Sequence, residues 1–204
     1  MYLLVVVVTC LTPGAGVLMT VSNAFRYGKA HAFVSPLGNA FGVLMMSIIS
    51  ATGLGSLISA TPEAFYGLQI LGALVLVYFG FKSWRASSLD LSRVAAAGGH
   101  AQKESSIFWG AASLQVTNPM LIVFLLSLMP PFIDPKADYV SAMALLIGIF
   151  VGTCLIVHLG YSYIACFAGR FLKGARFGWW LNHVSAVLFW FIAAGVAARL
   201  IESA

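Results

Sequence analysis

Two apolar stretches of the sequence are interrupted near their centres by a proline that follows a helix-capping residue. The first interruption reads Thr12-Pro13-Gly14-Ala15-Gly16, and the second reads Thr117-Asn118-Pro119. A proline inside a helix removes a backbone donor and clashes with the preceding turn, at a cost of ~3 kcal/mol or more. Threonine and asparagine are good N-cap residues, and proline is favoured at the first helical position. Each stretch is therefore predicted to form two half-helices, one that ends at the interruption and one that begins there.

The two interruptions could together bind a small zwitterion, such as an amino acid, through main-chain groups. The start of a half-helix presents unpaired N–H groups and a partial positive charge, which suit a carboxylate. The end of the preceding half-helix presents free carbonyl groups, which suit an ammonium group. The residues expected to bind substrate are Thr9, Thr12, Pro13, Gly14, Ala15, Gly16, Gln115, Thr117, Asn118 and Pro119. Alternatively, their polar side chains serve only to satisfy the interrupted backbone.

His158 is the histidine that falls in the middle of an apolar stretch. An ionisable residue at membrane depth is a functional candidate, and histidine titrates close to physiological pH. We therefore expect His158 to be a candidate for proton coupling. The alternative is a neutral histidine that is hydrogen-bonded between helices. No carboxylate lies deep in an apolar stretch, which favours neutral or modestly polar amino acids over dibasic ones as the ligand.

The composition is that of a protein surrounded by lipid. Of the 204 residues, 61% are hydrophobic and 8% are charged, whereas a soluble domain carries roughly 25% charge. The mean hydropathy is +0.97, which also excludes a disordered chain. The net charge of +5 comes without a basic stripe that interleaves aromatic residues, so nucleic-acid binding is not expected. The three cysteines lie inside apolar stretches and do not form a disulfide framework.

Six stretches of the chain are free of Asp, Glu, Lys and Arg. They run over residues 1–25, 30–62, 64–81, 105–133, 139–169 and 177–198. A membrane helix needs about 20 apolar residues, so each stretch can hold one span. The first begins without a basic region and is expected to be a span and not a cleaved signal peptide. The predicted fold is an all-α polytopic membrane protein with six transmembrane helices, of which helices 1 and 4 are interrupted.

The charges between the spans are distributed unequally. The connections 25–31, 82–104 and 170–176 share one side of the membrane, and nine of the eleven Lys and Arg residues belong to that side. These are Arg26, Lys29, Lys82, Arg85, Arg93, Lys103, Arg170, Lys173 and Arg176. The other side, which includes both termini, has only Lys136 and Arg199. Loops rich in Lys and Arg stay in the cytoplasm, so both termini are expected outside.

The chain divides into two halves of three helices each. A predicted cytoplasmic linker over residues 85–105 separates a first repeat, 1–84, from a second, 106–204, within one membrane domain. Glycine pairs recur at matching places, and their expected role is close helix packing: Gly38 and Gly42 in the first half, Gly148 and Gly152 in the second. Because three is odd, the second copy must be inserted upside down. Interrupted helices at matching positions of inverted repeats are typical of a transporter site at the bilayer midplane.

Several motifs in this order resemble the LysE/RhtB-type amino-acid exporters of bacteria, in the LysE translocator superfamily. They are TPGAG at 12–16, RYGKAHAFVSPLGNAFG at 26–42, LQILGALVLVYFGFKSWR at 68–85 and NPMLIVFLLSLMPPF at 118–132. Two positions depart from the family pattern. Ala15 stands where the family commonly has proline, and Met120 stands where a lysine usually follows NP. The resemblance implies export of amino acids or related metabolites across the bacterial inner membrane, driven by the proton gradient through antiport.

The predicted function is therefore a transporter that works by alternating access, not an enzyme, with a small-molecule substrate, the lipid bilayer and protons as partners. No phosphate-binding loop is present, so no ATP site and no cofactor is expected. Glycine-rich faces would allow a homodimer, which the sequence does not decide.

One alternative is a soft-metal carrier of the cadmium type, because Cys154 and His158 share a helix face and Cys10 lies beside the first interruption. The sequence has no closely spaced cysteine pair and no carboxylate ligand, so no metal site is expected. A membrane enzyme or non-transporting assembly protein is the other alternative, and no catalytic motif favours it.

Overall fold

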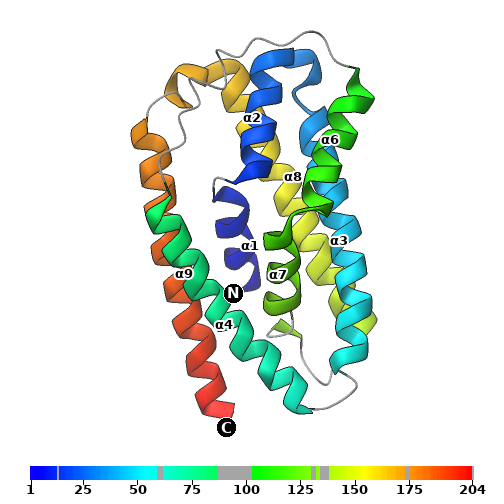
Figure 1. Ribbon diagram of the computed structural model, residues 1–204, viewed down its shortest axis with the longest axis vertical. Coiled ribbons are helices and arrows are strands. Elements are labelled where there is room, and N and C mark those ends of the chain that lie inside the picture. Colours follow the sequence, from blue (N-terminus) through cyan, green and yellow to red (C-terminus); the bar gives the residue numbers. More distant parts are fainter. Residues whose placement is uncertain are drawn as a thin grey trace.

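Helices make up the regular structure of the residues that the computed structural model describes, which are 1–12, 14–58, 62–86, 103–129, 132–133, 138–172 and 175–203. The helices are α1 (Tyr2–Leu11), α2 (Ala15–Tyr27), α3 (Val34–Ile58), α4 (Pro62–Arg85), α6 (Glu104–Val116), α7 (Pro119–Leu128), α8 (Tyr139–Leu172) and α9 (Ala175–Ser203), with a short 3-10 helix over Lys29–His31 (Figure 1). This part of the chain contains no strand, as the prediction of an all-α protein requires. Most of the predicted linker 85–105 lies outside the described residues.

Two of these helices are long and apolar enough to cross a bilayer, namely α3 over Val34–Gly53 and α8 over Tyr139–Phe167. The pair α1 and α2, bent by 53° at the first interruption, passes the same test when taken as one span. Large apolar side chains are exposed on both long helices, including Ile49 at 60% and Ile156 at 70%. Lipid is the solvent that such surfaces require. The protein is therefore a helical membrane protein, and the expected number of six spans stays a prediction.

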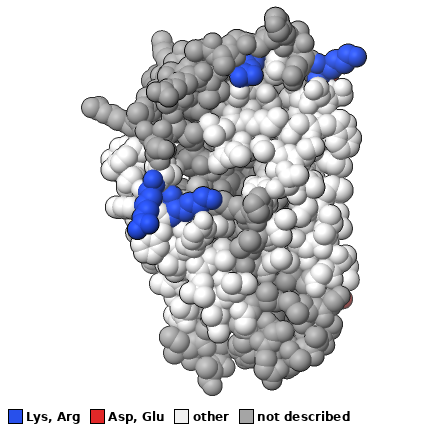
Figure 2. Space-filling view, in the orientation of Figure 1, with Lys and Arg blue, Asp and Glu red and all other residues white. Residues whose placement is uncertain are grey.

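The charged side chains are unevenly placed on the face drawn in Figure 2. Blue Lys and Arg atoms lie at the upper end and at mid-height on the left, whereas most of the lower described surface is uncharged. The turn that carries Arg26 and Lys29 and the start of α6 at Lys103 are at the same end of the molecule in Figure 1. This arrangement accords with the unequal charge distribution in the sequence. The position of the termini relative to the membrane stays a prediction.

The first interruption separates α1 from α2 with a different cap from the one expected. The hydroxyl of Thr12 donates 2.7 Å to the carbonyl oxygen of Val8, so this side chain closes the last turn of α1. The N-cap of α2 is Gly14, which has an extended backbone and offers no side-chain cap. The prediction that Thr12 caps the second half-helix is therefore wrong. Threonine bonds readily to the carbonyl four residues before it, and here that local bond is the one formed. Pro13 lies outside the described residues.

The second interruption follows the sequence more closely. α6 ends at Val116, and α7 begins at Pro119, the first helical position that proline favours. The carbonyl of Asn118 accepts hydrogen bonds from the N–H groups of Leu121 and Ile122, so Asn118 is the residue from which α7 starts. The Thr117 hydroxyl donates 2.8 Å to the carbonyl of Ser113 in α6.

The glycine pairs differ between the two halves. A Cβ on Gly42 would lie 2.6 Å from the carbonyl oxygen of Ala112, and one on Gly38 would collide with the carbonyl of Phe108, so α3 and α6 are in backbone contact. A Cβ on Gly148 or Gly152 would meet no other atom of the described chain within 4 Å. Within the described chain these two glycines do not show the close contact that Gly38 and Gly42 show, and their expected role in helix packing stays a prediction. A small-residue spacing permits close packing but does not supply the partner.

Candidate functional site

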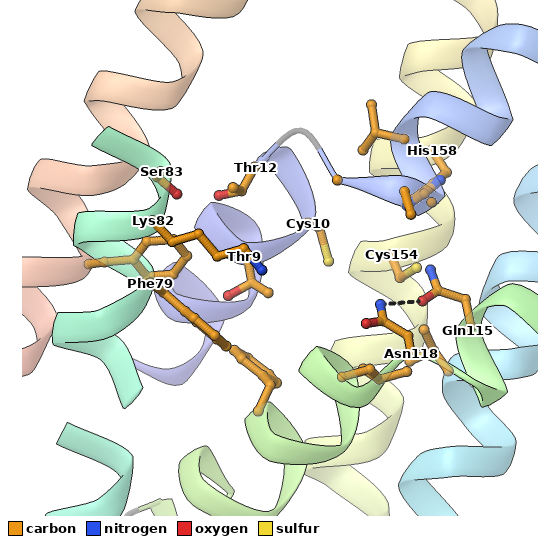
Figure 3. A pocket seen from close by; sticks show the side chains of 18 of the residues that line it. Thr9, Cys10, Thr12, Phe79, Lys82, Ser83, Gln115, Asn118, Cys154 and His158 are labelled. Atoms are coloured by element: carbon orange, nitrogen blue, oxygen red, sulfur yellow. Dashed lines mark hydrogen bonds between the residues drawn. The ribbon is translucent and has the colours of Figure 1, made fainter. Parts of the chain in front are cut away.

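A cavity of about 420 Å³ lies where the two interruptions meet α4, α8 and α9 (Figure 3). This volume falls within the range of pockets that hold small molecules. Residues from both interruptions line one space although more than half of the chain separates them. The expected site residues that line it are Thr9, Thr12, Gly14, Ala15, Gly16, Gln115, Asn118 and His158.

Three of the expected binding residues are not placed in this cavity. Thr117 is exposed and directs its hydroxyl back to its own helix. Pro13 and the side chain of Pro119 lie outside the described residues. The neutral polar groups that do line the cavity come from both interruptions, so a small polar ligand would find such groups on more than one side.

A chain of hydrogen bonds runs behind the cavity from α8 to the second interruption. His158 Nδ1 lies 2.8 Å from Thr20 Oγ1, and the Asn39 amide donates 2.9 Å to the same hydroxyl oxygen. The Gln115 amide donates 3.0 Å to Asn39 Oδ1, and the Asn118 amide donates 3.4 Å to Gln115 Oε1. This chain of hydrogen bonds therefore links α8, α2, α3 and α6 to Asn118, the residue from which α7 starts. Figure 3 shows its last bond between Gln115 and Asn118.

His158 is held by neutral partners on its neighbouring helices. Its Nδ1 lies 2.8 Å from the Thr20 hydroxyl oxygen and 3.4 Å from the Asn39 amide nitrogen. A hydroxyl oxygen can accept and donate at the same time, so these contacts are compatible with either tautomer of the ring. This geometry fits the alternative of a neutral histidine hydrogen-bonded between helices and leaves a role in proton coupling open.

Gly16 is the glycine of the first interruption where an added side chain would collide with other residues of the site. A Cβ at this position would lie 2.7 Å from Gln115 Nε2 and 3.3 Å from both Asn39 Oδ1 and His158 Cε1. The start of α2 thus rests directly on the hydrogen-bonded chain, with no room for a side chain between them. At Gly14, in contrast, a Cβ would meet only the Thr12 carbonyl oxygen at 4.0 Å.

Five residues of the cavity wall on α4 and α9 were not expected from the sequence to belong to the site. These are Phe79, Lys82, Ser83, Asn182 and Phe189. Lys82 had been assigned to a cytoplasmic connection, but α4 continues to Arg85 and the lysine belongs to its last turn. Figure 3 shows its ammonium group directed into the cavity toward Thr9. The sequence feature that could have indicated this role is a lysine one turn before the end of an apolar helix. A lysine side chain is long enough to reach from there into the cavity.

Two thiols also line the cavity. Cys10 of α1 and Cys154 of α8 are free and buried, and both sulfur atoms face the central space in Figure 3. Within the described residues, no group of three or more His, Cys, Asp or Glu side chains is arranged to hold a metal ion. The described part of the site therefore gives no support to soft-metal transport.

The chain is similar to known membrane proteins over nearly its whole length. The model of the family described as LysE type translocator matches residues 7–199. A homoserine/homoserine lactone efflux protein of Salmonella typhi is 30% identical over 198 residues, which cover 97% of this chain and 94% of the relative. A leucine efflux protein of Enterobacter sp. (strain 638) is 27% identical over 196 residues, covering 93% and 88%. An uncharacterized membrane protein of Vibrio cholerae is 31% identical over 189 residues, covering 92% and 90%. No solved structure matches.

Proposed function

The chain belongs to the LysE type translocator family, and from this membership we propose that it exports amino acids or closely related small metabolites across the bacterial inner membrane. Relatives of nearly full length are named as efflux proteins for homoserine, homoserine lactone and leucine. This function is transport and not catalysis.

The observation that carries the proposal is the single cavity formed where both helix interruptions meet. The start of α2 lines one side of it, with Gly14, Ala15 and Gly16 presenting backbone to the space. Unpaired N–H groups at a helix start favour a carboxylate, while the carbonyls at the end of α1 suit an ammonium group. Amides of Gln115 and Asn118 add neutral contacts from the other interruption. An amino acid of modest size satisfies these groups together.

The proposed architecture is a pair of inverted three-helix repeats, with α1 and α2 corresponding to α6 and α7, α3 to α8, and α4 to α9. The packing of the helices supports this correspondence. α3 packs on both α6 and α7, as α8 packs on both α1 and α2. α3 also packs on α8, and α4 on α9, which are the contacts that a pseudo-twofold axis would map onto themselves.

The cavity is accessible from one end, which fits one state of an alternating-access cycle. Lys82 and Ala86 line it at the C-terminal end of α4 and are exposed. At the opposite end its wall contains Phe124, Phe150 and Phe189, which are no more than 2% exposed and belong to the main hydrophobic core. With both termini outside, the accessible end faces the cytoplasm, where an exporter must take up its substrate. His158 is the proposed proton-coupling residue, since it is a titratable side chain that lines the cavity.

The proposal is tested with purified protein in liposomes that are preloaded with labelled leucine, homoserine or lysine. We expect efflux of the neutral amino acids to exceed that of lysine, and to increase when a pH gradient is imposed. Protein-free liposomes and a Gly16→Leu variant, whose side chain would enter the space of Gln115, are the controls. Efflux that is the same with and without protein for every amino acid would remove the proposed function.

A further inference from the structure

We propose that the Lys82 ammonium group binds the carboxylate of the exported substrate and so makes the site selective for ligands with a free carboxylate. This inference rests on the proposed export function and names the residue that sets its ligand chemistry. It was not expected from the sequence, which assigned carboxylate binding to helix starts alone.

The first argument is the position of Lys82. It belongs to the last turn of α4, and its side chain crosses into the cavity toward Thr9 of α1 (Figure 3). In Figure 3 Lys82 enters the cavity from the side opposite His158, with the ligand space between them. A carboxylate placed in that space would be within the field of both the fixed cation and the half-helix start.

The second argument is the sign of the charges around the cavity. Lys82 is the charged residue among the described lining residues, and none of the others there is an acid. The helix starts at α2 and α7 add partial positive charge. A ligand's ammonium group finds only neutral oxygens, such as those of Thr9 and Gln115. The described wall therefore favours an anionic group on the ligand and disfavours a second cationic group.

The third argument is the apolar remainder of the wall. Phe79 neighbours Lys82 on α4, and Val43, Leu121, Phe124, Phe150 and Phe189 complete the apolar lining. A carboxylate held at Lys82 would leave the rest of the ligand against these side chains. The preferred ligand class is therefore a small acid with a neutral side chain that is largely apolar.

α4 supplies its own control residue. Arg85 lies three positions after Lys82 and lines an outward groove together with Tyr78, Phe81 and Lys82, but it does not line the inner cavity. If Lys82 only contributes surface charge at the membrane interface, replacement of either cation should have the same effect. If Lys82 binds substrate, only its own replacement should depend on the substrate's carboxylate.

The experiment measures equilibrium binding of two chemical pairs to purified protein in nanodiscs by titration calorimetry. The pairs are leucine with leucinamide, and homoserine with homoserine lactone, in which the second member lacks a free carboxylate. We expect wild type and Arg85→Gln to prefer the acids by the same factor. Lys82→Gln should weaken binding of the acids roughly tenfold, as expected for loss of a charge-assisted hydrogen bond, and leave the amide and lactone within about twofold. Lys82→Arg should keep much of the preference.

Three results would overturn the inference in different ways. If wild type exports amino acids but Lys82→Gln keeps the full preference for the acids, the carboxylate is bound elsewhere and the proposed function stands. Equal weakening of all four ligands by Lys82→Gln and Arg85→Gln would instead assign Lys82 a general electrostatic or lipid-binding role. If wild type binds neither acid and exports no amino acid, the proposed function fails together with the inference.

Discussion

The imidazole Nδ1 of His158 lies 2.8 Å from the hydroxyl oxygen of Thr20, which places a titratable ring of α8 against the half-helix that begins at the first interruption. Both groups are almost completely buried, at 4% and 0% exposure. Which of the two groups donates depends on the protons that the ring carries, so a change of protonation at His158 acts directly on Thr20 and on its other partner, Asn39.

The first prediction is that replacement of His158 by Gln removes the pH dependence of export. Export by wild type is expected to change with pH, whereas the variant should give a flat profile. Initial efflux rates from liposomes over a pH series measure this. Cys154→Ser is the control, since Cys154 is the titratable neighbour one turn earlier on α8, and it should keep the wild-type profile. A titration that survives in His158→Gln would assign proton coupling to another group.

Asn39 is predicted to matter for stability more than any other amide of the hydrogen-bonded chain. It is 0% exposed, donates to Thr20 and accepts from Gln115, so Asn39→Ala leaves both partners without their bond. We expect a loss of about 1–2 kcal/mol, seen as a lower thermal midpoint in detergent. Thr117→Ala is the matched control, because that exposed hydroxyl bonds only within α6. Equal midpoints for the two variants would show that the buried chain contributes little to folding.

The two glycines of the first interruption are predicted to respond differently to the same substitution. Gly16→Ala places a Cβ 2.7 Å from Gln115 Nε2, so α2 or Gln115 must shift and export should fall at least tenfold. Gly14→Ala adds a Cβ in open space and should keep most of the activity. Efflux rates normalised to the amount of inserted protein provide the comparison. Similar losses in both variants would mean that the backbone at Gly14 also has to stay uncovered for the ligand.

The orientation of the chain can be tested by cysteine labelling. In a variant with Cys10, Cys154 and Cys166 replaced by serine, a cysteine is introduced at Lys29 or at Asp138, both of which are exposed. A membrane-impermeant maleimide added to intact cells should label the cysteine at 138, and the cysteine at 29 only after lysis. The reverse pattern would place the termini in the cytoplasm and direct the open end of the cavity outward.

The features that the sequence could predict are those governed by local chemistry. Proline and its capping neighbour act within one helical turn, so the interruptions at 12–16 and 117–119 could be located. Apolar runs likewise identified the helices around them. The bond from Thr20 to His158 joins residues 138 positions apart and depends on how α2 packs against α8. No periodicity in the sequence encodes such a pairing.

Two errors have equally physical causes. Lys82 was assigned to a loop because charge marks the end of an apolar run, yet the helix continues and the long side chain reaches back inside. Thr12 was assigned as a cap for the following half-helix, but a carbonyl of its own helix lies closer. Lys82 could belong either to a loop or to the helix, and Thr12 could bond either to the following half-helix or to its own. The tertiary structure decides between these possibilities.

The hydroxyls of Thr9, Thr12 and Thr117 each return to a carbonyl four residues earlier in the same helix. Each half-helix that ends at an interruption therefore completes its own last turn without help from the segment that follows. Such a joint can tilt while these hydroxyl bonds stay intact, so the resistance to movement comes from side-chain packing across the cavity and, at the end of α1, from the Tyr161 hydroxyl of α8, which donates 2.8 Å to the carbonyl oxygen of Leu11. A ligand that enters or leaves the cavity therefore acts directly on the angle between the two half-helices.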